Sequence, residues 1–178
     1  GATQGKVDLA KLAKAAGLRP YGDYGLNVLN SCALRACRDL GAEDMTLSFE
    51  TNLRQGASLG DYLPCGVIAY GYLPLMTFRA CPVQGPKGCG RCTGQATLTD
   101  RLGKSFPVVC RGRQYSQLLN TVPLYLGDKR QLLEGFSHAT LRFTIEDPAR
   151  CIRVMQLWRE GAPFREERTN GLYLRELK

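Results

Sequence analysis

The 178-residue sequence predicts an α/β fold built on parallel strands. Predicted strands alternate with predicted helices along the chain, which implies right-handed crossovers as in an α/β barrel or a doubly wound sheet. The run at 66–76, GVIAYGYLPLM, is apolar without polar alternation, as expected of a strand buried on both faces. Hydrophobic residues make up 44% of the chain and charged residues 22%, which excludes a disordered protein.

The first half begins with a capped helix. Asn30 or Ser31 provides the N-cap, and the helix is expected to run through Arg38 and to stop at Gly41. The β-rich run at 45–49 predicts the next strand, and a short helical segment follows it.

The second half combines a hairpin, a strand and a helix. Two short β runs flank residues 101–104, which predicts a hairpin. Residues 138–145 predict another strand. Asp147 then caps a helix that has Pro148 at its first position and is ended by Gly161.

We expect a single domain over residues 1–178. The sequence begins with Gly1 instead of Met, so we expect it to be a fragment of a longer protein. Its longest apolar stretch, 67–78, is interrupted by Gly71 and Pro74, whereas a membrane span needs about 20 apolar residues. No membrane partner is therefore predicted. The N-terminus also lacks the order of a secretion signal, which predicts a cytoplasmic protein.

The positive charge is concentrated in the middle of the chain. Residues 79–130 contain nine Lys and Arg against two Asp, so this stretch supplies +7 of the net charge of +8. Such a stretch attracts phosphate, which makes RNA a candidate partner. The alternatives are a solvated face or compensation for neighbouring thiolates.

Four of the eight cysteines lie within residues 77–115, a segment rich in Gly, Pro, Lys and Arg that we name the Cys-rich loop and hairpin. Two of the four form a Cys-x2-Cys pair, and an all-sulfur donor set suits zinc or an iron–sulfur cluster and excludes Mg²⁺ and Ca²⁺. Uncoordinated or disulfide-linked thiols are the alternative. The candidate metal ligands are Cys81, Cys89, Cys92 and Cys110.

Two carboxylates are candidates for acid–base chemistry. Glu50 follows the strand at 45–49 and Glu146 follows the strand at 138–145, so both are expected at the same end of a parallel sheet. Helix capping explains either residue without a substrate. The only histidine, His138, begins a strand and is expected at the opposite end, which argues against a serine or cysteine protease.

Five polar residues are candidate substrate-binding residues. Asn27, Asn30 and Asn120 can orient a ligand through hydrogen bonds, although turn and cap roles explain them equally well. Asp100 and Arg101 are expected in the hairpin turn.

Several motifs occur in an order that resembles the C-terminal half of the collagenase-like peptidases of unknown catalytic type (class U, family thirty-two). They cover residues 18–176 and read GDYGLNVLNS, TLSFE, YGYLPLM, CPVQGPKGCGRC, DRLGKSFPV, LNTVPLY, FTIED and TNGLYLRE. The resemblance implies half of a TIM-like barrel, with about four strand–helix units and a Cys-rich hairpin insertion. The missing N-terminal half of the barrel would then be a partner of this chain.

The resemblance also implies a function. Relatives in this family hydroxylate RNA bases or the ubiquinone ring with an iron–sulfur cluster, so the four cysteines are implied as ligands of a 4Fe–4S cluster, and Asp100 and Arg101 gain weight as site residues. The sequence thus predicts a cluster-dependent modifying enzyme. A peptide hydrolase, as the family name indicates, and a zinc-stapled nucleic-acid-binding module without catalysis remain alternatives. We also expect the isolated chain to be inactive and to form a homodimer through an exposed sheet edge or a barrel-facing apolar surface.

Overall fold

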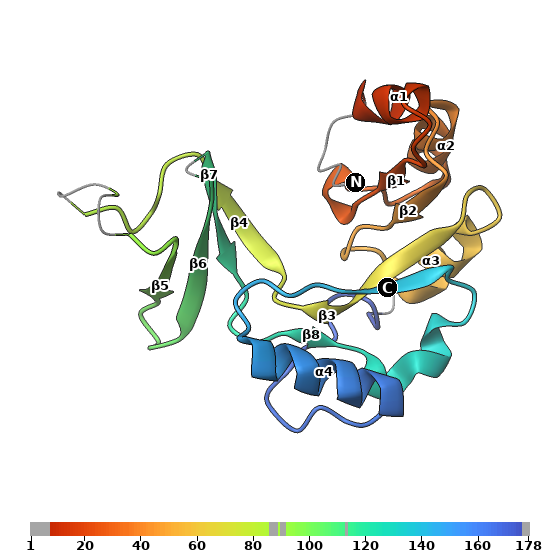
Figure 1. Ribbon diagram of the computed structural model, residues 1–178. Coiled ribbons are helices and arrows are strands. Elements are labelled where there is room, and N and C mark those ends of the chain that lie inside the picture. Colours follow the sequence, from red (N-terminus) through yellow and green to blue (C-terminus); the bar gives the residue numbers. More distant parts are fainter. Residues whose placement is uncertain (1–7, 86–88, 90–91, 113, 176–178) are drawn as a thin grey trace.

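The computed structural model describes residues 8–85, 89, 92–112 and 114–175 (Figure 1). Its strands form two sheets. Sheet A contains β1 (Tyr21–Gly22), β2 (Asp44–Thr46), β3 (Cys65–Gly71), β8 (Leu124–Tyr125) and β9 (His138–Leu141). Sheet B contains β4 (Pro74–Phe78), β5 (Gln95–Thr99), β6 (Ser105–Arg111) and β7 (Tyr115–Leu119).

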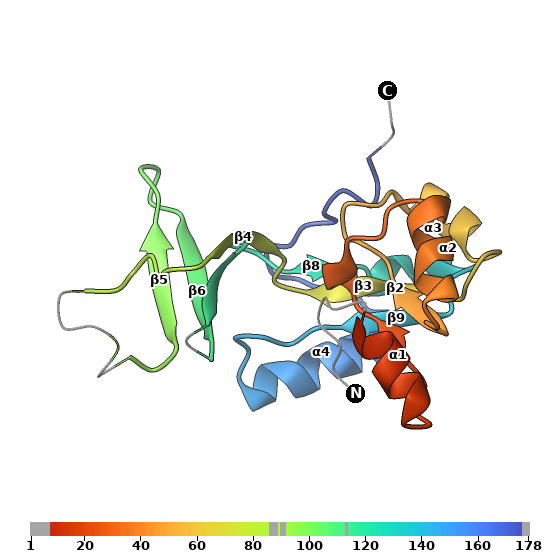
Figure 2. The same cartoon turned by 90° about the horizontal axis from the view of Figure 1, so that it is seen from above.

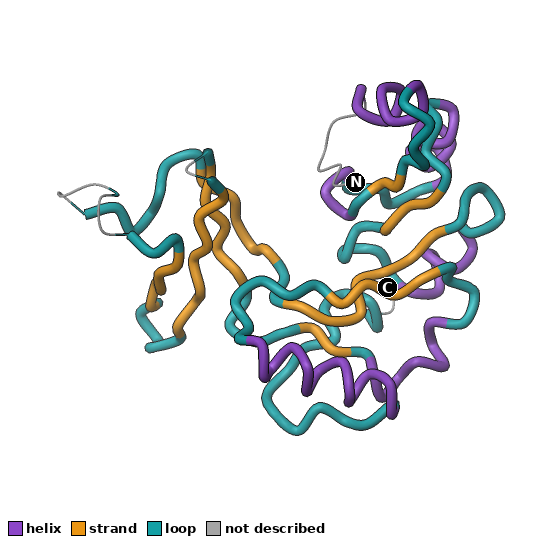
Figure 3. The backbone as a smooth tube through the Cα atoms, viewed as in Figure 1, coloured by secondary structure: helices purple, strands orange, loops and turns teal. Residues whose placement is uncertain are grey.

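The helices gather around sheet A, whereas sheet B extends away from it as an arm of strands and loops (Figures 2 and 3). The α-helices are α1 (Asp8–Ala15), α2 (Ser31–Asp39), α3 (Leu53–Leu59) and α4 (Pro148–Glu160), and the 3-10 helices are η1 (Tyr24–Leu26) and η2 (Gly127–Leu133). No helix in the described part of the chain is both long and apolar enough to cross a membrane.

Sheet A is mixed. β1, β2, β3 and β9 run parallel to one another, and β8 pairs antiparallel with the last residues of β3. All seven residues of β3 are buried. Their apolar side chains pack against the flanking helices and loops, which places the main core on both faces of this strand.

Sheet B is antiparallel throughout, in the order β4-β7-β6-β5. β5 and β6 form the hairpin that the sequence predicts, with Asp100 in its turn accepting hydrogen bonds from the backbone N–H groups of Leu102 (2.8 Å) and Lys104 (2.9 Å). β4 and β5 are the outer strands of the sheet.

The predicted half of a TIM-like barrel is wrong. Four successive strand–helix units are not present in the described chain, because the segment after β3 forms antiparallel hairpins instead of a crossover helix. The apolar run at 66–76, predicted as one strand, divides after Gly71 into β3 and β4, which belong to different sheets. Gly71 has φ of 143°, and a Cβ at this position would crowd the carbonyl oxygen of Arg142. The described chain belongs to the mixed α/β fold class.

The helix caps agree with the sequence. The Asn30 Oδ1 atom accepts from the Ala33 N–H (2.9 Å), and the Asp147 Oδ1 atom accepts from the Arg150 N–H (2.8 Å). Gly161 ends α4 in the left-handed region with φ of 67°. Short polar side chains therefore satisfy N–H groups that the first helical turn leaves without partners.

Candidate functional site

A pocket of about 450 Å³ lies between the ends of β1 and β2 and one face of sheet B. The segments after β1 and β2 supply one wall, and β4 and β7 supply the other. The lining residues are Tyr24, Gly25, Asn27, Phe49, Glu50, Pro74, Leu75, Met76, Thr77, Tyr115 and Gln117. The pocket therefore combines aromatic rings, amides and one carboxylate.

The strand register explains the sheet B wall. Thr77 of β4 is paired with Gln117 of β7, and Tyr115 lies two residues before Gln117, so these side chains share one face. Gln117 is only 7% exposed, and its Oε1 atom accepts a hydrogen bond from the Nε–H of Arg111 (3.3 Å). Arg111 is the register partner of Tyr115 and belongs to the same face.

A local hydrogen-bond chain fixes the opposite wall. Asn27 ends η1 in the left-handed region with φ of 52°, and its Oδ1 atom accepts from the Ser48 hydroxyl (2.7 Å). The Ser48 oxygen accepts from the Glu50 N–H (3.3 Å). Ser48 is buried and Glu50 is exposed, so the chain anchors the Glu50 backbone and leaves its carboxylate at the pocket.

One cationic side chain lies against the ring of Tyr24, a residue of the pocket lining. The guanidinium of Arg142 lies 5.1 Å from the centre of the Tyr24 ring, and its Nη1 group donates to the carbonyl oxygen of Tyr72 (3.3 Å). Burial raises the pKa of Tyr24, and the charges of Arg142 and Arg111 oppose that shift. The charges of Arg142, which follows β9 of sheet A, and of Arg111, in β6 of sheet B, therefore both act on this buried phenol.

Of the two predicted catalytic carboxylates, only Glu50 lines the pocket. The Oε2 atom of Glu146 accepts from the N–H groups of Thr144 (2.6 Å) and Ile145 (2.9 Å) instead. Burial raises the pKa of Tyr70, and the charge of Glu146 raises it further. Glu146 thus holds the loop before α4, and the structure does not bring the two carboxylates into one pocket.

Of the five predicted substrate-binding residues, one lines the pocket and four lie elsewhere. Asn27 lines the pocket, whereas Asn30 caps α2. Asp100 and Arg101 lie in the exposed turn of the β5–β6 hairpin. Asn120 follows β7, where its Oδ1 atom accepts from the Thr121 N–H (2.9 Å).

The four candidate metal ligands lie near one end of sheet B. Cys81 follows β4, Cys92 precedes β5, and Cys110 lies near the end of β6, with Cys89 in the loop between the first two. The Cys110 N–H donates to the Gly94 carbonyl oxygen (2.8 Å), which places the start of β5 beside Cys110.

These thiols are free, and Cys92 is exposed while the other three are half-buried. Within the described ranges, no group of three or more His, Cys, Asp or Glu side chains is arranged to hold a metal ion. The predicted ligands at 81, 89, 92 and 110 are therefore near one another in topology but are not assembled into a donor set. Residues 86–88 and 90–91 of the same loop lie outside the described chain.

The remaining cysteines lie outside the Cys-rich loop, and one of them is a buried packing residue. Cys65 is buried, its Sγ donates to the Leu63 carbonyl oxygen (3.0 Å), and burial raises its pKa to about 11. Cys37 and Cys151 are half-buried, whereas Cys32 is exposed. A thiol that stays protonated at neutral pH is a poor metal ligand, so Cys65 is not a further candidate.

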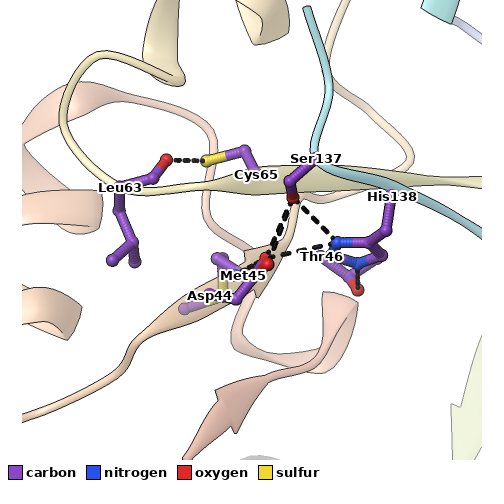
Figure 4. Close-up of polar contacts among 7 residues, drawn as sticks. All are labelled: Asp44, Met45, Thr46, Leu63, Cys65, Ser137 and His138. Atoms are coloured by element: carbon purple, nitrogen blue, oxygen red, sulfur yellow. Dashed lines mark hydrogen bonds and ion pairs between the residues drawn. The ribbon is translucent and has the colours of Figure 1, made fainter.

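A second polar cluster lies at the other end of sheet A, where β9 begins (Figure 4). The Nε2 atom of His138 lies 3.0 Å from the Thr46 hydroxyl, and its Nδ1 atom lies 3.0 Å from the Ser137 hydroxyl and 3.2 Å from the Asp44 Oδ1 atom. The ring occupies the space beside Gly66, where a Cβ would overlap it. These contacts join β2, β3 and β9, so they stabilise the sheet away from the pocket.

Sequence reasoning did not identify most of the pocket. Tyr24 and Phe49 lie within quoted motifs, but the residue patterns assign neither a role at a site. Gln117 lies outside those motifs, and Arg142 is one basic residue among many. The alternation of side chains along 115–119 was the one available signal, because it places Tyr115 and Gln117 on the same face.

No protein-family model matches the chain, and it has no significant similarity to a curated protein or to a solved structure. The pocket and the four cysteines are therefore the features of the chain that bear on its function.

Proposed function

We propose that this chain is part of a modifying enzyme that binds an RNA nucleotide or a related aromatic substrate in the pocket between sheet A and sheet B. The observation that carries the proposal is the pocket itself, where the Glu50 carboxylate and the ring of Phe49 lie with Tyr24, beside which the Arg142 cation is placed. Aromatic rings stack on bases, and Phe49 and Tyr115 are half-buried rings in the lining. Arginine binds phosphate, so the cationic surroundings of the pocket suit the other half of a nucleotide.

Glu50 is the proposed acid–base residue. Its carboxylate is at the pocket, and its backbone is anchored through Ser48 and Asn27. A carboxylate held at a fixed position beside a bound ring can accept or return a proton. Glu146 is not part of this proposal, since its carboxylate binds backbone N–H groups.

The proposed cofactor is a 4Fe–4S cluster or zinc, held by Cys81, Cys89, Cys92 and Cys110. Four thiols that come from one end of a single sheet have the donor chemistry that either group requires. A cluster would supply electron transfer, and zinc would hold the loop in place. The described residues do not form the donor set, so no step of the reaction is assigned to it.

The resemblance to the collagenase-like peptidases supports this proposal and also one alternative. An outer strand of sheet B, β4, contributes Pro74–Thr77 to the pocket beside Glu50. An extended peptide can bind to the open edge of such a strand, which favours a peptide hydrolase as the second candidate. In either case we propose that the N-terminal part of a longer protein completes the site.

The test compares two substrates on the longer protein, purified anaerobically. An organic oxygen-atom donor is added, which gives its oxygen to a C–H bond of the base and is itself reduced by two electrons. We then expect a short RNA to gain the mass of one oxygen atom, and we expect Glu50→Gln to abolish this gain while Glu134→Gln, an exposed control, retains it. Cleavage of gelatin that depends on Glu50, without modified RNA, would instead establish the hydrolase. RNA binding without modification or cleavage would favour the zinc-stapled binding module.

A further inference from the structure

β6 presents two neighbouring residues to opposite faces of sheet B. Cys110 is paired with Ser116 of β7, and Arg111 is paired with Tyr115. Side chains alternate between the faces of a strand, so Arg111 lies on the pocket face with Tyr115 and Gln117, and Cys110 lies on the other. A metal bound through Cys110 would therefore be separated from the pocket by the sheet.

Arg111 lies next to the pocket lining on this face, where it is bound to the buried Gln117 side chain. Its Nε–H donates to the Oε1 atom of Gln117 (3.3 Å), and Gln117 is 7% exposed. A guanidinium has five N–H donors, and this bond occupies one of them. The Gln117 contact thus orients the planar group without consuming its capacity to bind an anion.

The position of Arg111 matches an anionic group on the ligand. Its charge lowers the pKa of the Tyr24 phenol against the effect of burial, as does the charge of Arg142, so both cations act on the same point of the pocket. Glu50 is the one carboxylate in the lining, and it comes from the opposite wall. A ligand with a neutral ring and a phosphate at one end fits this separation of charge.

We propose that Arg111 binds the phosphate of the pocket ligand and that Gln117 is its positioning residue. This inference deepens the proposed function and rests on it for the identity of the pocket. It adds that phosphate binding occurs on the face opposite Cys110 and would not use a metal bound by the cysteines.

The experiment measures binding of adenosine monophosphate and of adenosine to the metal-free chain by isothermal titration calorimetry. We expect the wild-type chain to bind the monophosphate more tightly than adenosine. Arg111→Gln should weaken monophosphate binding by roughly tenfold or more and leave adenosine binding unchanged. Arg153→Gln, an exposed residue on α4, is the matched control and should change neither affinity.

Gln117→Leu keeps a similar volume but removes the acceptor. We expect it to weaken monophosphate binding severalfold in the wild-type background and not at all in the Arg111→Gln background, because the two residues act through one contact. Equal losses in both backgrounds would overturn the positioning role. Circular dichroism confirms that each variant is folded.

Equal affinity of the wild-type chain for adenosine and its monophosphate, or an unchanged affinity in Arg111→Gln, would overturn the inference. So would monophosphate binding that requires loaded metal. Metal content is measured separately, so Arg111-dependent binding by a chain that never takes up metal would refute the proposed cofactor and leave the inference standing. Failure of RNA modification with Arg111-dependent binding would likewise refute only the proposed reaction.

Discussion

The contact between Gly66 and His138 allows a quantitative test of how sheet A is held together. A methyl group at position 66 would overlap the Nε2, Cδ2 and Cε1 atoms of the imidazole, so Gly66→Ala must displace the ring. The displaced ring loses its contacts with the Thr46 hydroxyl (3.0 Å), the Ser137 hydroxyl (3.0 Å) and the Asp44 carboxylate (3.2 Å). At about 1 kcal/mol for each of two to three contacts, we expect a loss of about 2–3 kcal/mol in the free energy of unfolding.

Urea unfolding followed by circular dichroism measures this loss, and a double-mutant cycle assigns it. In the His138→Ala background the ring is absent and the methyl group has room, so Gly66→Ala should cost less than about 0.5 kcal/mol there. A free energy of unfolding of Gly66→Ala equal to that of the wild-type chain would contradict a stabilising role of this contact. The same loss in the wild-type and His138→Ala backgrounds would also contradict it.

Three other predictions concern an ion pair, the two carboxylates and the sheet edges. Arg168 donates to both Asp128 oxygens (2.8 and 2.6 Å) and holds the pKa of Asp128 below its usual value. The ion pair therefore stabilises the fold at neutral pH, and this contribution to the free energy of unfolding is lost as the pH falls below about 4. Arg168→Gln should reduce that loss in urea unfolding at several pH values, and an unchanged pH profile would contradict the assignment. Glu146→Gln should lower the free energy of unfolding by about 1 kcal/mol, whereas Glu50→Gln should leave it unchanged within about 0.5 kcal/mol. A larger loss in Glu50→Gln than in Glu146→Gln would contradict the structural role of Glu146. Light scattering should show self-association through β4 or β5, the outer strands of sheet B, and a monomer at all concentrations would exclude it.

Local features of the structure were predictable from the sequence because they depend on short-range chemistry. Asn30 and Asp147 cap helices, and Asp100 closes the hairpin, because each side chain bonds to backbone groups a few residues away. The sheet arrangement was not predictable in the same way. A continuous apolar run does not show where the chain changes sheet. At Gly71 the chain passes close to Arg142, a residue that is far away in the sequence and follows β9.

The candidate site shows the same division. Glu50 and Asn27 were found because they follow predicted strands and turns, and both line the pocket. Glu50 and Glu146 were both expected at one end of a parallel sheet, but the Glu146 carboxylate turns back to nearby backbone N–H groups and does not line the pocket. Arg111 appeared only as one charge of a basic stretch, and its role depends on a register with β7 that the sequence does not specify.

The most direct test of the account is the metal content of the anaerobically purified chain, compared with a Cys89→Ser variant. We predict either about four iron atoms with matching sulfide or about one zinc per chain, and loss of that metal in the variant. A Cys32→Ser variant, in which an exposed thiol outside the Cys-rich loop is replaced, should retain it. The contrary result is a wild-type chain that stays free of metal after anaerobic reconstitution with iron and sulfide or with zinc. If its thiols at 81, 89, 92 and 110 also all react with a thiol reagent, these cysteines do not bind a metal or cluster.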